Sequence, residues 1–134
     1  MYKRQVQPYT DTPLDHEKVG QAVYLNMISR ARDYIYITTP YLVIDVATNT
    51  ALCNAAKAGV DVRIITPHIP DKWVVHQTTQ SFYQPLLNAG VRIYEYTPGF
   101  VHGKNFAVDD VFGTVGSVNM DMTLVRMSSG LSDR

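Results

Sequence analysis

The sequence has little cysteine, no surplus of charge and no long apolar run. Its single cysteine, Cys53, excludes an internal disulfide, so the fold must hold without one. Twelve Lys and Arg residues balance twelve Asp and Glu residues, and no polybasic run occurs, which argues against charge-driven binding to nucleic acid or anionic lipid. No window approaches the roughly 18 uninterrupted apolar residues that cross a bilayer, and the first residues lack a signal-peptide core. We therefore expect a soluble piece of protein.

What the sequence does contain is core material. The chain has 134 residues, of which 46% are hydrophobic, including nine Tyr, four Phe and one Trp. That composition excludes a disordered chain, and the length suits one globular domain. We expect a lead-in segment over residues 1–14, a folded domain over 15–121 and an atypical tail over 122–134.

Hydrophobic periodicity predicts alternating helices and strands. Pro85 should break or kink the third helix, and Asp109 and Asp110 should form the turn of a hairpin. The pattern predicts an α/β fold, a mixed sheet with helices on both faces, in which the first strand is buried on both sides and the last elements are missing. The predicted helices begin near residue 15, cover 45–57 and cover 71–89, and the predicted strands are 34–39, 60–66, 91–96, 100–109 and 112–118.

The predicted hairpin carries side chains that can bind a ligand or take part in catalysis. Side chains of an extended segment alternate between faces, so His102 and Lys104 share one face and Asp109 falls on the other. Ser117 and Asn119 likewise project together from the following segment. An imidazole, an ammonium, a hydroxyl and a carboxamide that converge in this way suit a phosphoryl centre, where cationic and neutral donors hold the oxygens.

Without any comparison with known families, two simpler interpretations of His102 and Lys104 stay open. A lone His-x-Lys is more often an ordinary surface pair than a site. A metal site is weaker still, because His68 and His76 are the nearest other histidines and no carboxylate stands at ligand spacing from His102. His68 and His76 either border an entrance for a headgroup or lie in a solvated loop and helix start, and the second arrangement is the commoner.

The spacing as a whole resembles the signature of the phospholipase D superfamily, His-x-Lys, four residues, Asp, six residues, Gly-Ser-x-Asn. Residues 37–41, 59–67, 68–71 and 89–100 are similar to the second catalytic half of bacterial cardiolipin synthases, and the resemblance covers about residues 6–121. The signature is matched by His102, Lys104, Asp109, Gly116, Ser117 and Asn119.

The resemblance implies a role for each residue. In this family two such motifs face one another across a shared active site, and one histidine becomes a phosphohistidine. The first motif usually supplies that nucleophile, so the resemblance implies that His102 is the general acid and base. Lys104 and Asn119 would bind the phosphate, and Ser117 would help to position it. Asp109 belongs to the catalytic motif, but its place on the other face favours a structural role.

The resemblance also implies a reaction and a setting. Cardiolipin synthases transfer a phosphatidyl group between two phosphatidylglycerol molecules and release glycerol, and no metal or organic cofactor is expected. The full-length family works at the cytoplasmic side of the cell membrane. The partner of this chain would be the missing first catalytic half or a second subunit, including a second copy of the chain, and no nucleic acid is expected.

Two departures from the family pattern keep alternatives open. There is no second His-x-Lys, so the chain alone holds half an active site. The glutamate that hydrogen-bonds the catalytic histidine in the family falls at Gly130. The alternatives are therefore a one-motif phosphodiesterase or nuclease that works as a homodimer, and a truncated fragment without activity.

Overall fold

The computed structural model describes residues 5–10, 17–69 and 73–117, with side chains for all of these except residues 73–75. The expected tail over 122–134 and most of the expected start of the first helix therefore lie outside the described residues. None of the helices in the described ranges is long and apolar enough to cross a membrane.

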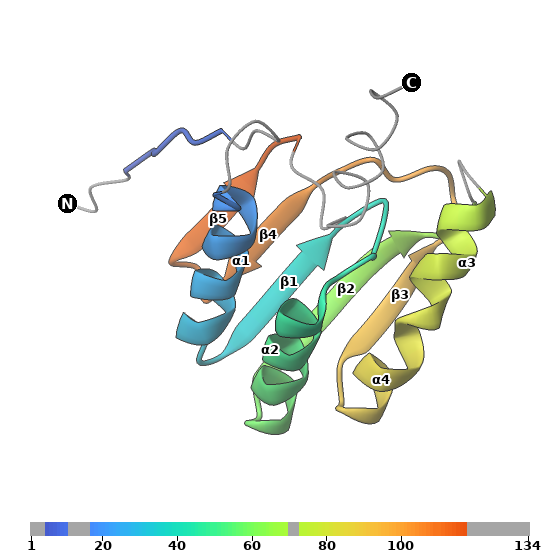
Figure 1. The fold of residues 1–134 in the computed structure, drawn as a ribbon, viewed down its shortest axis with the longest axis horizontal. Coiled ribbons are helices and arrows are strands. Elements are labelled where there is room, and N and C mark those ends of the chain that lie inside the picture. The colour runs from blue at the N-terminus through green and yellow to red at the C-terminus, as the bar shows by residue number, and fades with distance from the viewer. Residues whose placement is uncertain (1–4, 11–16, 70–72, 118–134) are drawn as a thin grey trace, which may run out of the picture.

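Five strands form one mixed sheet in the order β3-β2-β1-β4-β5 (Figure 1). β1, β2 and β3 are parallel, while β4 is antiparallel to β1 and to β5. The α/β class and the mixed sheet predicted from the sequence are confirmed. The strands are β1 (Tyr34–Thr38), β2 (Asp61–Pro67), β3 (Arg92–Tyr96), β4 (Asn105–Val108) and β5 (Phe112–Val115).

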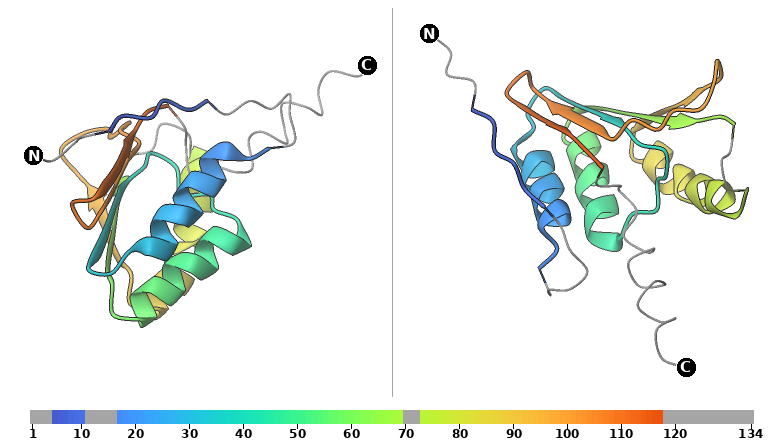
Figure 2. Two further views of the ribbon diagram at one scale, coloured as in Figure 1. Left: turned by 90° about the vertical axis from the view of Figure 1, so that its left-hand side faces the viewer. Right: turned by 90° about the horizontal axis from the view of Figure 1, so that it is seen from above.

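All four described helices cover the same face of this sheet, as both views in Figure 2 show. The prediction of helices on both faces is therefore wrong for the described residues. The prediction that β1 is buried on both sides is also wrong, because Ile35 and Ile37 are buried whereas Tyr36 is 39% exposed. Tyrosine has the same strand preference as an aliphatic residue, so composition alone did not separate the two faces. The helices are α1 (Val19–Arg30), α2 (Val46–Lys57), α3 (Trp73–Ser81) and α4 (Tyr83–Asn88).

The core lies between the helix layer and the inner face of the sheet. Alternate residues of β1, β2 and β4 point inward and meet apolar side chains from three helices. Phe106 of β4 stacks on Tyr24 of α1 with the ring centroids 5.3 Å apart. The most buried members of this cluster are Ile35, Ile37, Leu42, Leu52, Val62, Ile64, Leu86 and Val108.

The helix boundaries follow local chemistry. The side chain of Asp45 caps α2 by accepting a hydrogen bond from the Thr48 backbone N–H at 2.9 Å, which matches the predicted start. Among the described residues α1 begins at Val19, while the predicted start near residue 15 lies outside them. The predicted third helix is two helices that part at Phe82. In a continuous helix the Pro85 ring would clash with the carbonyl of Ser81, four residues earlier. This clash explains why α3 ends at Ser81.

The two helix–Gly–strand passages share one turn. Gly59 and Gly90 follow α2 and α4 with φ of 98° and 99°, a conformation that only glycine adopts without strain. In each, the glycine N–H and the next N–H donate to the last turn of the helix, so both passages end in a Schellman motif. A shared turn, rather than an internal repeat, accounts for their likeness.

Candidate active site

The candidate site lies at the carboxyl ends of the parallel strands. Because β4 lies beyond β1 in the sheet, the loop that leaves β3 must cross the ends of β2 and β1 before it reaches β4 (Figure 1). His102 lies in this loop, and Lys104 immediately precedes β4. Open α/β sheets bind ligands at this edge. His102 was predicted within a strand, but regular pairing begins only at Asn105.

Lys104 and His102 lie in direct contact. The Lys104 ammonium donates to the backbone carbonyl of His102 at 3.0 Å, and Nζ lies 3.3 Å from each ring nitrogen of His102. Phe100 stacks on the imidazole, with the ring centroids 5.8 Å apart. The imidazole thus contacts both an aromatic ring and a cation, while the His102 residue stays exposed.

Lys104 has no carboxylate partner among the described residues, since none of the ion pairs found there includes it. Partial burial lowers the pKa of Lys104, because removal from water disfavours the charged ammonium. A bound anion would compensate that ammonium in the way a carboxylate partner does elsewhere. The electrostatics of this position therefore favour a negatively charged ligand.

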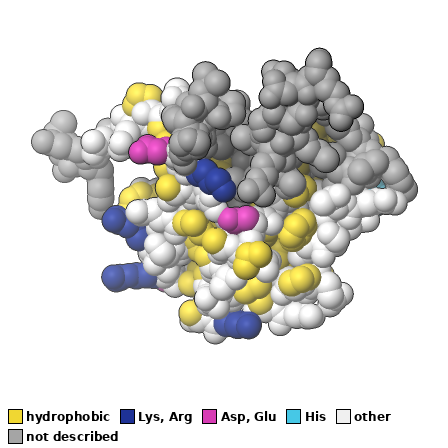
Figure 3. Space-filling view, in the orientation of Figure 1, with side chains coloured by type: hydrophobic (Ala, Val, Ile, Leu, Met, Phe, Trp, Pro, Cys, Tyr) yellow, Lys and Arg dark blue, Asp and Glu magenta, His cyan; other side chains and the backbone are white. Residues whose placement is uncertain are grey.

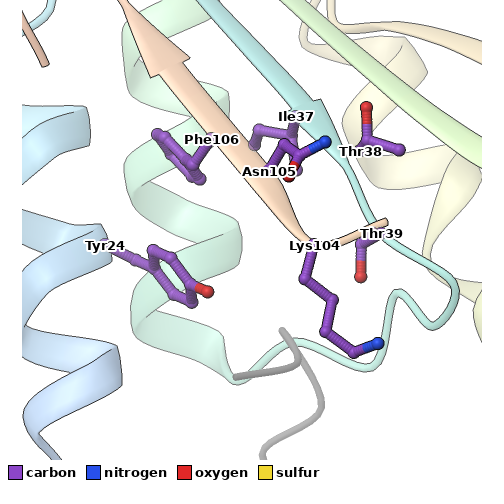
Figure 4. Close-up of a pocket in the computed structure, with 7 residues that line it drawn as sticks. All are labelled: Tyr24, Ile37, Thr38, Thr39, Lys104, Asn105 and Phe106. Atoms are coloured by element: carbon purple, nitrogen blue, oxygen red, sulfur yellow. The ribbon is translucent and has the colours of Figure 1, made fainter. Parts of the chain in front are cut away.

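A small pocket opens beside Lys104 on the helix side of the sheet (Figure 4). Its empty volume of about 170 Å³ includes open solvent, so it is a shallow hollow rather than an enclosed cavity. Burial raises the pKa of Tyr24 in its wall to about 12, which keeps the phenol neutral. The pocket is lined by Tyr24, Ile37, Thr38, Thr39, Lys104, Asn105 and Phe106.

Asp109 lies at the opposite end of β4 from Lys104. Its carboxylate accepts hydrogen bonds from three consecutive backbone N–H groups, those of Arg32 at 2.7 Å, Asp33 at 3.0 Å and Tyr34 at 2.7 Å. These bonds lower the pKa of Asp109, the largest cause being the bond from Tyr34. The structure therefore does not bring Asp109 to His102 and Lys104, and its contacts join the hairpin turn to the start of β1.

The second half of the motif is only partly described. The backbone N–H of Gly116 donates to the carbonyl of Lys104 at 3.3 Å, so the chain at Gly116 runs alongside Lys104. Ser117 follows directly and is exposed. Asn119 lies outside the described residues. No group of three His, Cys, Asp or Glu side chains that could hold a metal occurs within the described ranges.

Sequence reasoning missed some of the surroundings of this site. Tyr24 had no distinguishing signal, since aromatic residues are common in any core, and Phe100 was noted only as the end of the segment 89–100. Thr38 and Thr39 lie in the segment 37–41, which was noted only for its resemblance to the family. Their place in the pocket depends on strand order, which brings the end of β1 beside Lys104.

Known structures with this arrangement define the class of fold. A phospholipase D family member, Nuc from Salmonella typhimurium, superposes with a TM-score of 0.65 over 78% of this chain and 66% of that chain, at 23% identity. At that identity the likeness shows the fold alone, so this is a phospholipase D-like fold.

The sequence defines the family within that class. Residues 24–129 match the family described as "Cardiolipin synthase, PLD-like domain", and the chain belongs to it. It is 40% identical over 117 residues to a cardiolipin synthase of Halalkalibacterium halodurans and 46% identical over 100 residues to cardiolipin synthase 2 of Bacillus cereus. An uncharacterized protein of Streptococcus mutans is 54% identical over 114 residues.

The matches cover most of this chain but little of its relatives. They take in 85%, 87% and 75% of the chain, yet 25%, 23% and 20% of the Streptococcus, Halalkalibacterium and Bacillus proteins. The chain thus spans about a quarter of the length of the curated relatives that it matches.

Proposed function

We propose that this chain is one catalytic half of a phosphatidyltransferase of the cardiolipin synthase kind, completed by a second His-x-Lys motif from elsewhere. The observation that carries the proposal is the contact of His102 with Lys104, whose ammonium has no carboxylate partner among the described residues. The 40–46% identity to two cardiolipin synthases supports phosphatidylglycerol as the substrate.

His102 acts in this proposal as the general acid and base. The histidine of the other motif attacks phosphorus and forms a phosphohistidine while the bond to the headgroup oxygen breaks. His102 donates a proton to that oxygen, and glycerol leaves. His102 then takes the proton from a hydroxyl of a second phosphatidylglycerol, whose oxygen attacks phosphorus and releases the first histidine.

The remaining motif residues hold the phosphate. The Lys104 ammonium balances the charge on the phosphoryl oxygens, and Ser117 and Asn119 donate neutral hydrogen bonds to them. Asp109 acts at a distance, because its three backbone bonds fix the far end of the hairpin that carries Lys104. No step of this mechanism requires a metal or an organic cofactor.

A chimera tests the proposal. This chain replaces the matching segment of the Halalkalibacterium cardiolipin synthase, with His102 intact or changed to Ala, and product formation is measured on phosphatidylglycerol in mixed micelles. We expect His102→Ala to lower kcat about 10²- to 10⁴-fold, the usual contribution of a general acid–base group. Because His102 is exposed, Tm should stay unchanged. Equal product from the two chimeras would overturn the proposal.

The isolated chain separates this function from the homodimer alternative. We expect the chain alone to form no product. Phosphodiester cleavage by a purified twofold dimer of the chain, lost in the His102→Ala variant, would instead indicate a one-motif enzyme.

A further inference from the structure

A second polar cluster lies at the carboxyl edge of the sheet, outside the motif. His68 Nδ1 lies 2.8 Å from Glu95 Oε2. The Tyr83 hydroxyl donates to Glu95 Oε1 at 3.3 Å and lies 2.7 Å from the Thr66 hydroxyl. His68 directly follows β2, Thr66 and Glu95 belong to β2 and β3, and Tyr83 begins α4. Three elements thus converge on one carboxylate.

This cluster and Lys104 share one edge and one side of the sheet. The ends of β1 and β2 are neighbours, and parallel strands lie about 4.8 Å apart. Glu95 meets Tyr83 of α4, and Lys104 lines a pocket with Tyr24 of α1, so both clusters are on the helix-covered side. The loop from β3 to β4 passes from one cluster to the other (Figure 1). A ligand at Lys104 that extends along the edge toward β3 therefore approaches His68.

The two clusters have different chemistry. The His102 and Lys104 pair is cationic, with no carboxylate partner in the described residues. At the other cluster, hydrogen bonding from His68 is the largest of the causes that lower the pKa of Glu95, so this group is a carboxylate at neutral pH. A second phosphate would be repelled there. A neutral hydroxyl, by contrast, bonds readily to an imidazole that a carboxylate orients.

The orientation of His68 leaves one ring nitrogen for a ligand. Glu95 engages Nδ1, and Nε2 has no hydrogen-bond partner in the part of the chain that the structure describes. The His68 side chain is 57% exposed. A purely structural role for the His68 side chain would add little to the stability of the fold, because exposed ion pairs contribute little to the free energy of folding. The backbone there is already held, since the His68 N–H donates to the Tyr96 carbonyl at 3.1 Å.

We propose that His68, oriented by Glu95, binds a hydroxyl of the polyol headgroup whose phosphate lies against Lys104. This inference rests on the proposed function, since it deepens the account of the same substrate. His68 is a binding residue in it, and Glu95 is a positioning residue that acts through the imidazole.

Binding to the 134-residue chain tests the proposal without catalysis. Glycerophosphoglycerol and inorganic phosphate are titrated separately, and affinities are read from the shifts of the histidine ring signals in NMR spectra. We expect His68→Ala to weaken glycerophosphoglycerol about tenfold, as the loss of one good hydrogen bond does, and to leave phosphate within twofold. Glu95→Gln should give a smaller loss. The control Asp61→Asn removes an exposed ion pair at the other end of β2 and should change neither.

Three results would overturn the proposal. The first is an unchanged affinity for glycerophosphoglycerol in His68→Ala with Tm maintained. The second is an equal loss for phosphate, which would put His68 at the phosphate itself. The third is an equally tight, equally His68-dependent complex with phosphocholine, a phosphate ester that has no alcohol hydroxyl.

The chimera separates this inference from the proposed function. If the chimera transfers phosphatidyl groups, His68→Ala should raise KM for phosphatidylglycerol about tenfold with kcat nearly constant, and His68→Gln should recover part of the loss. An unaltered KM would overturn the proposed role of His68 and leave the transferase proposal intact. An inactive chimera whose chain still binds glycerophosphoglycerol through His68 would sink the transferase proposal and leave the hydroxyl site in place.

Discussion

The two ends of the β4–β5 hairpin differ in how firmly they are held. At the turn, Asp109 accepts three backbone hydrogen bonds, and Asp110 accepts one from the Tyr34 hydroxyl at 2.6 Å. At the other end, the Lys104 ammonium contacts only His102 among the hydrogen bonds found in the described residues. One end is anchored to β1, and the other keeps a cation available to a ligand.

The anchored end also carries local strain. Asp109 and Asp110 have φ of 53° and 55°, the left-handed values of a type I′ turn, where Asn-Gly is the usual pair. Aspartate adopts this conformation at some cost, and the side-chain bonds of both residues offset it. The comparison teaches that the aspartate of the motif fixes the position of the hairpin, while the histidine and lysine lie at the end where we propose that the phosphate binds.

The largest expected effect is at Phe106, which lies in β4 between the two ends of the hairpin and packs against α1. Phe106→Ala should cost about 3–5 kcal/mol of unfolding free energy, because it leaves a cavity against Tyr24 where Phe106 is 2% exposed. Urea unfolding measures the loss. Phe106→Leu should cost less than half as much, and equal losses from both would show that the stacked rings contribute little.

At the Lys104 end of the hairpin, Lys104→Met should lower kcat in the chimera about 10²- to 10³-fold, since it removes the cation that stabilises the charge on the phosphoryl oxygens. Tm should stay within about 1 °C, because no buried contact is lost. Lys104→Arg should keep more of the activity, because it retains the cation. A loss of activity that follows a loss of Tm would contradict the division between the two ends.

At the anchored end, Asp109→Ala should lower Tm by about 5 °C, because three backbone N–H groups lose their acceptor. Asp109→Asn should lower it less, since the amide oxygen still accepts and asparagine tolerates a positive φ. If Asp109→Ala lowered activity without lowering Tm, the anchoring role would be wrong.

The same residue predicts a pH dependence. The pKa of Asp109 is lowered in the folded chain, so its contribution is present above the unfolded pKa of about 3.9 and is lost as pH falls through the folded pKa. The Tm difference between the wild type and Asp109→Asn should therefore be constant near neutral pH and shrink below about pH 4. A difference that grows on acidification would contradict this sign.

The smallest effect is expected at Tyr34. Its hydroxyl accepts from the Asp110 N–H at 2.8 Å and donates to the Asp110 carboxylate. Tyr34→Phe should lower Tm by about 2 °C, because both bonds lie at an exposed site where water replaces them. A fall as large as that of Asp109→Ala would show that both aspartates anchor the turn equally.

Much of this molecule is determined by local sequence. Asp45 caps a helix, Gly59 and Gly90 end two helices, and Asp109-Asp110 turns the hairpin, each where the pattern predicts. These features depend on one or two residues and their immediate backbone, so a linear pattern contains them. The motif spacing likewise predicts that His102 and Lys104 meet, because two residues of one extended segment are near neighbours in any fold.

Only the tertiary structure decided the rest. All the described helices cover one face of the sheet because of the path that the chain takes between the strands. The composition of the strands does not predict this path. Figure 3 shows the outer surface of that helix layer, where hydrophobic patches lie among polar side chains and a few charged ones. Strand order, too, places Thr38 and Thr39 beside Lys104 and brings Glu95 to His68 across 27 residues. Such contacts join segments that are remote along the chain, so they exist only once the sheet has formed.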